Sequence, residues 1–176
     1  AGEPSGDLHG GKLIKAIKSL NPNSSFMGHG GNSMRDEGMH LIEHVDNLAI
    51  MGFAEVLRHL PRMKRIMKST VSAIERSKPD RIILIDYPGF NLRLAKSLFP
   101  LKIPITYFIL PQAWAWKEGR VKILKRFIDQ SISIFPFEND WYNRRGLRVE
   151  YFGHPFVDIE HFDETTKSFY KRHSLD

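Results

Sequence analysis

Asp86 is the residue whose type and position point most directly to chemistry. It ends the run Arg-Ile-Ile-Leu-Ile-Asp at residues 81–86, whose continuous apolar character predicts a strand buried on both faces of a parallel sheet. Open α/β sheets place their binding crevice at the carboxyl ends of the strands, where a carboxylate can act as a general base. The alternative is a carboxylate that only orders the following Tyr87-Pro88-Gly89 turn. Asp80 precedes the strand and reads as a turn residue at its opposite end.

Two glycine-containing segments add candidate binding groups. The first combines small and polar residues at the start of a predicted helix, namely Glu3, Ser5, Gly6 and Asp7. Ser and Asp at such a position either cap the helix or bind a hydroxyl group. The second segment reads Gly-His-Gly-Gly at residues 28–31. Gly30 and Gly31 there either let backbone amides approach a ligand closely or form a plain turn.

Trp114 and Trp116 stand two residues apart, directly after another predicted strand. They either contact a sugar or an acyl chain, or belong to the core, because Trp is large and often half-buried. Further polar candidates lie in the same segment or at the ends of later strands: Gln112, Arg120, Glu138 and His154. A lone His such as His154 serves either a ligand or the packing of its loop.

The elements that must position these residues alternate between apolar runs and helical patterns. The clearest helix covers residues 61–77, where apolar residues recur at helical spacing from Met63 to Ile74 and Pro61 suits the first position. Other helices are predicted at 6–20, 91–99, 117–127 and 137–145, and strands at 25–27, 81–86, 105–110, 131–135 and 149–152. This alternation predicts an α/β fold with an open, doubly wound parallel sheet and right-handed crossovers.

The two ends of the chain carry expectations of their own. A glycine-rich turn like that at residues 1–7 normally follows a central strand, so we expect a strand before Ala1. Without that strand, the sheet should be unstable and residues 3–7 unanchored. Residues 1–156 read as one domain, and the polar residues 157–176 read as a linker.

Composition narrows the chemistry. The 176 residues include no cysteine, which excludes a thiolate nucleophile, a disulfide framework and a cysteine-based metal site. No apolar run approaches the roughly 20 residues of a membrane-spanning helix, and no signal-peptide pattern opens the chain. The net charge of +6 favours an anionic partner, such as nucleic acid, anionic lipid or a phosphorylated sugar.

Taken in order, these motifs resemble those of the lipid-A-disaccharide synthase family. The resemblance covers residues 1 to about 158 and rests on an ordered set of motifs. They are Ala-Gly-Glu-x-Ser-Gly-Asp at 1–7, Gly-x-Gly-Gly-x-x-Met at 28–34, Met-Gly-Phe-x-Glu-Val-Leu at 51–57, Pro-Asp-x-x-x-x-Ile-Asp-x-Pro-x-Phe-Asn at 79–91, Pro-x-x-Trp-Ala-Trp at 111–116 and Gly-His-Pro at 153–155.

The resemblance implies the Rossmann-like amino-terminal domain of a GT-B glycosyltransferase that is inverting and needs neither metal nor cofactor. Its substrates would be UDP-2,3-diacylglucosamine and 2,3-diacylglucosamine 1-phosphate, with UDP released. Asp86 would be the general base, and the other candidates named above, together with Asn91, would line the cleft. Most of the UDP site would lie in a carboxy-terminal half, so we expect the chain alone to be inactive.

Two residues depart from the family pattern. Gly89 stands where relatives usually carry a second Asp, so Asp86 is expected to lack a close acidic neighbour. Leu110 stands where relatives usually have Ser before the proline. Both departures concern substrate contacts more than the reaction.

A basic cluster raises the question of a membrane. It consists of Arg58, Arg62, Lys64, Arg65 and Lys68, beside Met51, Phe53 and Met63. It either docks on the anionic inner membrane from the cytoplasm, or forms the solvated face of an ordinary amphipathic helix.

Three other functions are compatible with parts of the sequence. His40-Leu41-Ile42-Glu43-His44 matches the inverted zinc-peptidase pattern, which requires both histidines on one helical face, but the segment reads as strand then loop. A UDP-sugar epimerase of the same two-domain layout would need different cleft acids. A basic nucleic-acid-binding module would need a recognition signature, and none is present.

Overall fold

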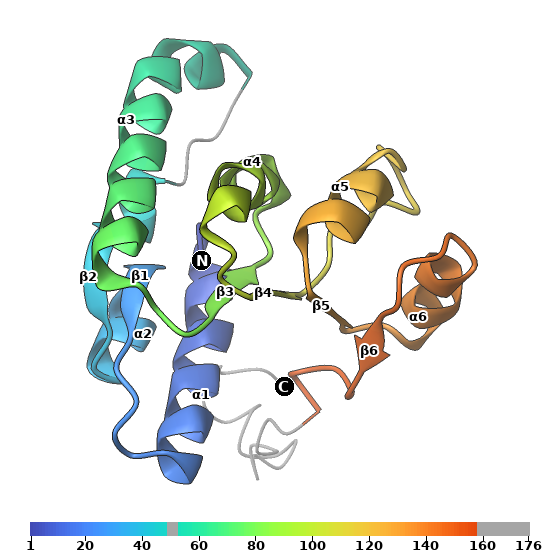
Figure 1. Cartoon of the computed structure of the whole chain (residues 1–176), viewed down its shortest axis with the longest axis horizontal. Coiled ribbons are helices and arrows are strands. Elements are labelled where there is room, and N and C mark those ends of the chain that lie inside the picture. Colours follow the sequence, from blue (N-terminus) through green and yellow to red (C-terminus); the bar gives the residue numbers. More distant parts are fainter. Residues whose placement is uncertain (49–52, 158–176) are drawn as a thin grey trace, which may run out of the picture.

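The computed structural model describes residues 1–48 and 53–157 (Figure 1). Its strands are all parallel and form two sheets. The larger sheet has the order β3-β4-β5-β6, with β3 at Ile82–Ile85, β4 at Ile105–Phe108, β5 at Gln130–Ser133 and β6 at Glu150–Tyr151. The smaller sheet pairs β1, Met27–Gly30, with β2, His40–His44. The α/β, Rossmann-like class is confirmed, whereas a single continuous sheet is not what the described strands form.

Helices cover both sides of the strands. Above them in Figure 1 lie α3 (Phe53–Ser77), α4 (Pro88–Leu98) and α5 (Arg120–Phe127), and below them lies α1 (Pro4–Leu20). The short α2 (Asn32–Asp36) packs on α1, and α6 (Pro136–Asn143) packs on β5 and β6. The helices α1, α4 and α6 each begin one to three residues earlier than predicted. The reason is that Pro4, Pro88 and Pro136 each occupy the first turn of their helix.

The start of α3 was predicted wrongly. Pro61 was expected to be the first helical residue, but α3 begins at Phe53 and contains Pro61 in its interior. A proline inside a helix removes one backbone hydrogen bond and kinks the helix without always ending it. The opposite difference affects α5, which begins at Arg120 and leaves residues 117–119 in the preceding loop.

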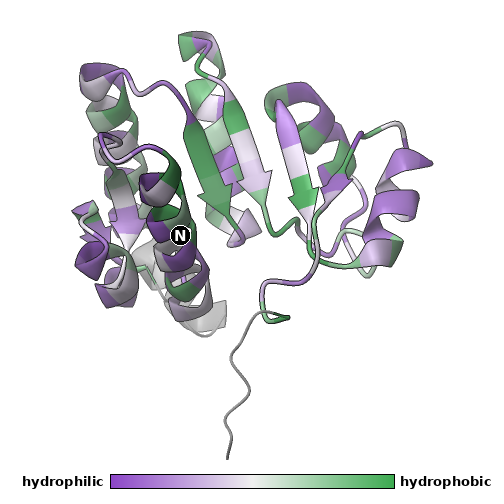
Figure 2. Ribbon diagram, turned by 90° about the horizontal axis from the view of Figure 1, so that it is seen from below, coloured by the Kyte–Doolittle hydropathy of each residue, from purple (hydrophilic) through white to green (hydrophobic). Residues whose placement is uncertain are grey.

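The main core lies between the larger sheet and the helices α3, α4 and α5. Tyr107 of β4 and Tyr142 of α6 are fully buried in or beside it, and β3 is hydrophobic along its length (Figure 2). Continuous apolar strands are typical of sheets covered on both faces. A groove of about 820 Å³ separates β1 from β3 and is lined by residues of both strands. The expectation of a further strand before Ala1 stays a prediction.

Asp7 fastens α1 to the start of α2. Its Oδ1 accepts hydrogen bonds from the backbone amides of Gly31 (2.6 Å) and Met34 (3.1 Å), and its Oδ2 accepts one from Ser33 (2.9 Å). A Cβ at Gly31 would lie 2.7 Å from Oδ2, so the contact requires glycine. Burial acts to raise the pKa of Asp7, but these hydrogen bonds outweigh it and lower that pKa.

His29 joins β1 to α3 in a similar way. Its Nε2 lies 2.8 Å from the hydroxyl oxygen of Thr70, and that hydroxyl donates its own hydrogen to the carbonyl of Ile66. The neutral ring therefore donates from Nε2. Burial lowers the pKa of His29 from 6.5 to about 4.

Asp7→Asn should destabilise the fold by roughly 1–3 kcal/mol, because the amide offers one acceptor oxygen and turns donors toward backbone donors. Urea unfolding monitored by circular dichroism measures this loss. Asp36→Asn, on the exposed side of α2, is the matched control and should change stability little. Equal stability of the two variants would contradict the role assigned to Asp7.

Acid should weaken the fold through His29. In the unfolded state His29 takes up a proton near pH 6.5, whereas in the folded state it does so only near pH 4. The stability that comes from the neutral His29 is therefore complete above pH 6.5 and is lost as the pH falls toward 4. This loss amounts to about 3 kcal/mol. Urea unfolding at several pH values should show a shallower slope for His29→Gln, and the same slope as the original chain for His40→Gln, because His40 is exposed.

Candidate active site

The centre of the candidate site is a strained turn at the carboxyl end of β3. Asp86 and Tyr87 both have left-handed backbone angles, with φ of 44° and 47°. Such conformations cost energy for residues other than glycine and persist only where the surroundings enforce them. They cluster at functional sites, so the observed outlier itself marks this turn as a candidate.

Three hydrogen bonds hold the turn in place. The carbonyl oxygen of Asp86 accepts from the hydroxyl of Tyr107 (2.7 Å) and from the side-chain amide of Asn91 (2.6 Å). The amide nitrogen of Asp86 donates to the carbonyl of Phe108 (3.0 Å). Asn91, expected to touch substrate, is buried and also donates to the carbonyl of Ile85 (3.1 Å). Its side-chain nitrogen therefore serves the turn, and contact with substrate stays a prediction.

The Asp86 side chain is half-buried, and burial raises the pKa of its carboxyl group. A backbone hydrogen bond from Tyr87 and the charge of His9 act in the opposite direction. A carboxylate with a raised pKa is a stronger base than an exposed Asp, which suits proton abstraction.

Glu3 is an acidic neighbour of Asp86, contributed by the residue before α1. Burial raises the pKa of Glu3, and the charge of Asp86 raises it further. Gly2 makes this approach possible, because a Cβ at that position would collide with the ring of Tyr87. The expectation drawn from Gly89, that Asp86 has no close acidic neighbour, did not consider Glu3, on which the charge of Asp86 acts.

His9 is a site residue that the sequence reasoning missed. It lies on α1, is 7% exposed, and its Nδ1 has no hydrogen-bond partner among the described residues. Burial lowers its pKa, and the charge of Asp86 opposes that shift. Its ring contacts Phe156 and Phe108 at centroid distances of 5.0 and 6.5 Å. The available signal was a histidine in the second turn of the helix that follows the glycine-rich segment.

The remaining residues of the first two motifs have structural partners. Gly6 packs near Ala1 and Ile85, and a Cβ at Gly30 would lie 2.6 Å from the methyl group of Met39. Ser5 is exposed on the first turn of α1. Both oxygens of Asp7 are already engaged by α2, and Gly31 is one of its donors. Substrate contact by these residues stays a prediction.

A second group of predicted residues gathers around the loop between β4 and α5. Trp114 donates from its ring nitrogen to Oε1 of Glu138 (3.0 Å). Glu138 is 1% exposed, its Oε2 lacks a partner among the described residues, and burial raises its pKa. Tyr142 donates to the carbonyl of Pro111, at the base of the same loop. The loop is thus tied to α6 at two points.

Cations cover the outer tryptophan of this loop. Trp116 is 55% exposed, and its ring centroid lies 4.4 Å from Lys117 Nζ and 4.7 Å from the guanidinium of Arg120. The charge of Arg120 also acts on the buried hydroxyls of Tyr107 and Tyr142. Arg120 therefore contacts the outer tryptophan and also acts by charge on tyrosines that hydrogen-bond to Asp86 and to Pro111. Gln112 is exposed at the start of the loop.

His154 completes the rim near His9. Its ring lies 5.6 Å from that of Phe135 and 5.3 Å from that of Phe156, which also contacts His9. Its Nδ1 accepts from the amide of Phe156 (3.2 Å). The structure thus brings His154 toward the same end of the strands as Asp86.

The zinc-peptidase pattern does not have the required geometry. His40 and His44 lie on strand β2, whereas the pattern needs one face of a helix. Among the side chains that the structure describes, no group of three from His, Cys, Asp or Glu is placed to hold a metal ion.

Asp86→Asn should lower the pKa of Glu3, because it removes the negative charge that disfavours ionisation of Glu3. Carbon-detected NMR titration of the Glu3 carboxyl group measures the change. Asp80→Asn, at the opposite end of β3, should leave the titration of Glu3 unchanged. An unaltered Glu3 titration in Asp86→Asn would show that the two carboxylates do not interact.

Comparison with known proteins shows what the chain as a whole is similar to. The family model described as "Lipid-A-disaccharide synthetase" matches residues 1–176. The chain is 39% identical over 175 residues to a lipid-A-disaccharide synthase of Myxococcus xanthus, covering 99% of this chain and 46% of that protein. A lipid-A-disaccharide synthase of Acidobacterium capsulatum is 41% identical over 177 residues, covering 100% of this chain and 44% of the relative.

A relative of the same name from Koribacter versatilis is 37% identical, with 100% of this chain and 46% of the relative aligned. The chain thus spans less than half the length of these curated relatives. Because the family model extends over every residue, the chain belongs to the lipid-A-disaccharide synthetase family.

Proposed function

We propose that this chain forms the acceptor side of an inverting glycosyltransferase that makes the lipid A disaccharide. The donor is UDP-2,3-diacylglucosamine and the acceptor is 2,3-diacylglucosamine 1-phosphate. The observation that carries the proposal is the Asp86 carboxylate, which lies at a strained strand end with a raised pKa. The family membership and the names of the relatives support the same reaction class.

In the proposed mechanism, Asp86 removes the proton from the 6-hydroxyl group of the acceptor. The oxygen forms a bond to the anomeric carbon of the donor from the face opposite UDP. The bond between that carbon and the UDP oxygen breaks, and UDP leaves with the electron pair. A single displacement inverts the configuration, and neither a metal ion nor a cofactor takes part.

The neighbours of Asp86 have distinct parts in this scheme. Tyr107 and Asn91 hold its backbone and fix the direction of the side chain. The charge of His9 acts to lower the pKa of Asp86, and the charge of Asp86 raises the pKa of Glu3. The loop carrying Trp114 and Trp116 offers an exposed aromatic surface for the acceptor, since aromatic rings suit the apolar face of a sugar.

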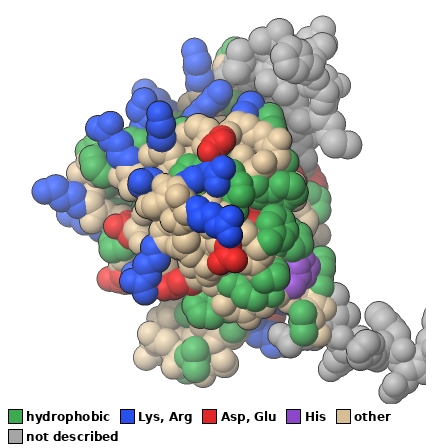
Figure 3. Space-filling model, turned by 90° about the vertical axis from the view of Figure 1, so that its right-hand side faces the viewer, with side chains coloured by type: hydrophobic (Ala, Val, Ile, Leu, Met, Phe, Trp, Pro, Cys, Tyr) green, Lys and Arg blue, Asp and Glu red, His purple; other side chains and the backbone are tan. Residues whose placement is uncertain are grey.

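The surface charge fits substrates that carry phosphate. Lys and Arg side chains spread over a large part of the face in Figure 3, and hydrophobic side chains gather beside them. Among the predicted basic cluster, Arg62, Lys64, Arg65 and Lys68 are exposed on α3, while the Arg58 side chain lies outside the described ones. We propose peripheral contact of this cluster with the anionic inner membrane from the cytoplasm.

The structure bears on the membrane question in one further respect. No helix within the described part of the chain is long and apolar enough to cross a membrane. The rival functions, a UDP-sugar epimerase and a nucleic-acid-binding module, have no observation in their favour here comparable with the family match.

A chimera tests the proposed base. This chain replaces the aligned part of the Myxococcus xanthus relative, and disaccharide formation is followed with purified donor and acceptor. Asp86→Asn should reduce kcat by about 10²- to 10⁴-fold, which is the usual contribution of a general base. Asp80→Asn is the matched control and should keep kcat within about twofold. Full activity of Asp86→Asn would exclude Asp86 as the base. The 176-residue chain alone should form no disaccharide.

A further inference from the structure

A second groove lies between α3 and α4, separate from the residues assigned to the sugar chemistry. It has a volume of about 820 Å³. Its apolar lining comes from α3 and from the turn and helix that follow Asp86, through Met63, Met67, Val71, Tyr87 and Phe90. The groove reaches Tyr87, which is the residue next to the proposed base. By the helical rise of 1.5 Å per residue, the stretch of α4 from Gly89 to Ser97 spans about 12 Å.

One wall of the groove is fixed and the other is adaptable. The hydroxyl of Tyr87 donates to the carbonyl of Leu48 (3.0 Å), and its ring stacks on Phe90 at a centroid distance of 6.1 Å. Met63 and Met67 on the facing helix are half-buried, and methionine side chains adapt to irregular apolar partners. Gly89 leaves open space, because a Cβ there would meet no atom within 4 Å.

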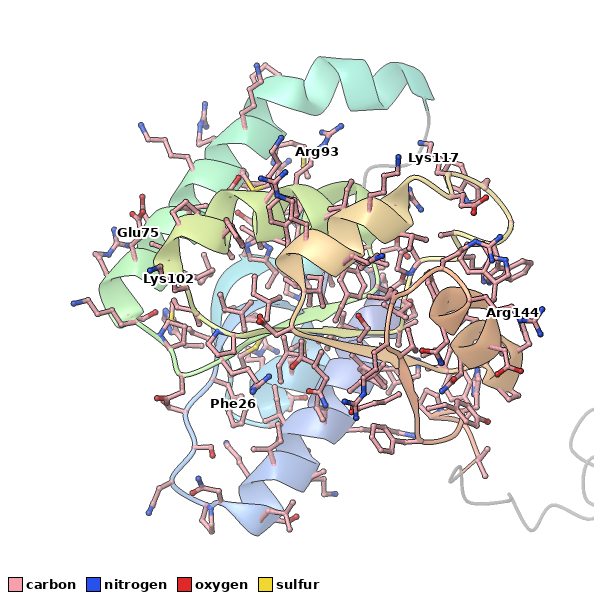
Figure 4. All side chains as sticks on the ribbon, turned by 45° about the vertical axis from the view of Figure 1, so that its right-hand side comes forward. Phe26, Glu75, Arg93, Lys102, Lys117 and Arg144 are labelled. Atoms are coloured by element: carbon pink, nitrogen blue, oxygen red, sulfur yellow. The ribbon has the colours of Figure 1, made fainter. Side chains whose placement is uncertain are left out.

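The charged residues that line the groove are all cations. Lys64 and Lys68 come from α3, and Arg93 comes from α4. Arg93 lies between the two helices in the side-chain view (Figure 4). None of the lining residues is acidic, and the three cations are exposed. An apolar floor bordered by cations fits a ligand with a hydrocarbon chain and an anionic head, and fits a nucleic acid or a neutral hydrocarbon poorly.

We propose that this groove binds one acyl chain of a lipid monomer whose phosphate group lies at Lys64, Lys68 and Arg93. The identification of this lipid as the glycosyl acceptor rests on the proposed function, whereas the proposal that the groove binds such a lipid does not. A lipid held there would present its sugar on the side of Asp86, because Tyr87 forms both the end of the groove and the residue after the base. The groove would then select the acceptor by its chain and its phosphate together.

Methionine methyl groups report on this groove directly. The chain is labelled with ¹³C at its methionine methyl groups, assigned by Met→Leu substitution, and titrated with dodecyl phosphate below its micelle concentration. The signals of Met63 and Met67 should shift saturably. Those of Met34 and Met39 should not, because these residues pack in the separate small core with Ile14.

Two further ligands test the requirement for an anionic head. Dodecyltrimethylammonium should bind at least about tenfold more weakly, since its charge is repelled by the cationic rim. Inorganic phosphate alone should leave the Met63 and Met67 signals unchanged. Shifts that appear only with phosphatidylglycerol vesicles, and not with the monomer, would overturn the proposal in favour of a membrane contact.

Charge-reversal variants provide a matched comparison. Lys68→Glu combined with Arg93→Glu should weaken dodecyl phosphate binding by at least about tenfold. Arg65→Glu combined with Lys96→Glu makes the same change in net charge on the same two helices, outside the groove lining, and should leave affinity within about twofold. Gly89→Leu should fill the open mouth and weaken binding, because a Cβ at this position meets no atom within 4 Å.

Equal losses in the two double variants, or equal shifts at Met34 and Met39, would overturn the groove proposal. The groove and the proposed function fail separately. If the Asp86→Asn chimera loses turnover but the chain does not bind dodecyl phosphate, only the groove proposal is refuted. If the chain binds dodecyl phosphate but the Asp86→Asn chimera keeps full turnover, only the role of Asp86 as base is refuted.

Discussion

The left-handed turn at Asp86 and Tyr87 is the constraint on which both candidate binding regions depend. Two adjacent residues occupy a costly backbone conformation, and hydrogen bonds from Tyr107 and Asn91 to a single carbonyl oxygen hold them there. The first residue of the turn presents its carboxylate at the strand end. The second supplies the ring that closes the α3–α4 groove. A change in the donors to that carbonyl would therefore displace the chemistry and the apolar site together.

The amino-terminal segment is built against this turn by close packing. Gly2 admits the ring of Tyr87, which brings Glu3 beside Asp86. Asp7 then fixes the other face of α1 to α2 through three backbone amides. Glycines thus allow these elements to pack closely, because a larger side chain would not fit where the two elements nearly touch. The charge environment of Asp86 follows from that packing.

Hydrophobic patterns within single segments predicted the helices and strands of those segments well. The apolar run before Asp86 became β3, and the helical spacing between Met63 and Ile74 lies within α3. Pro61 misled the placement of the start of α3, since proline is compatible with both a first and an interior position. The division into two sheets depends on which strands pair across the fold, and no segment encodes such pairing by itself. The hydrogen bonds from the Asn91 side chain to the carbonyls of Ile85 and Asp86 were also not predicted, although these residues are only six and five positions earlier.

The positive φ of Asp86 also limits which residues can replace it. Asp and Asn tolerate left-handed backbone angles better than most side chains, and longer acids such as Glu lack that tolerance. The backbone therefore favours Gly, Asn and Asp at this position, and of these only Asp can accept a proton on its side chain. The substitution at residue 86 that the fold tolerates best, Asp86→Asn, would therefore give a well-folded protein without the proposed base. A lineage could keep such a protein as a lipid or sugar binder after its chemistry was lost.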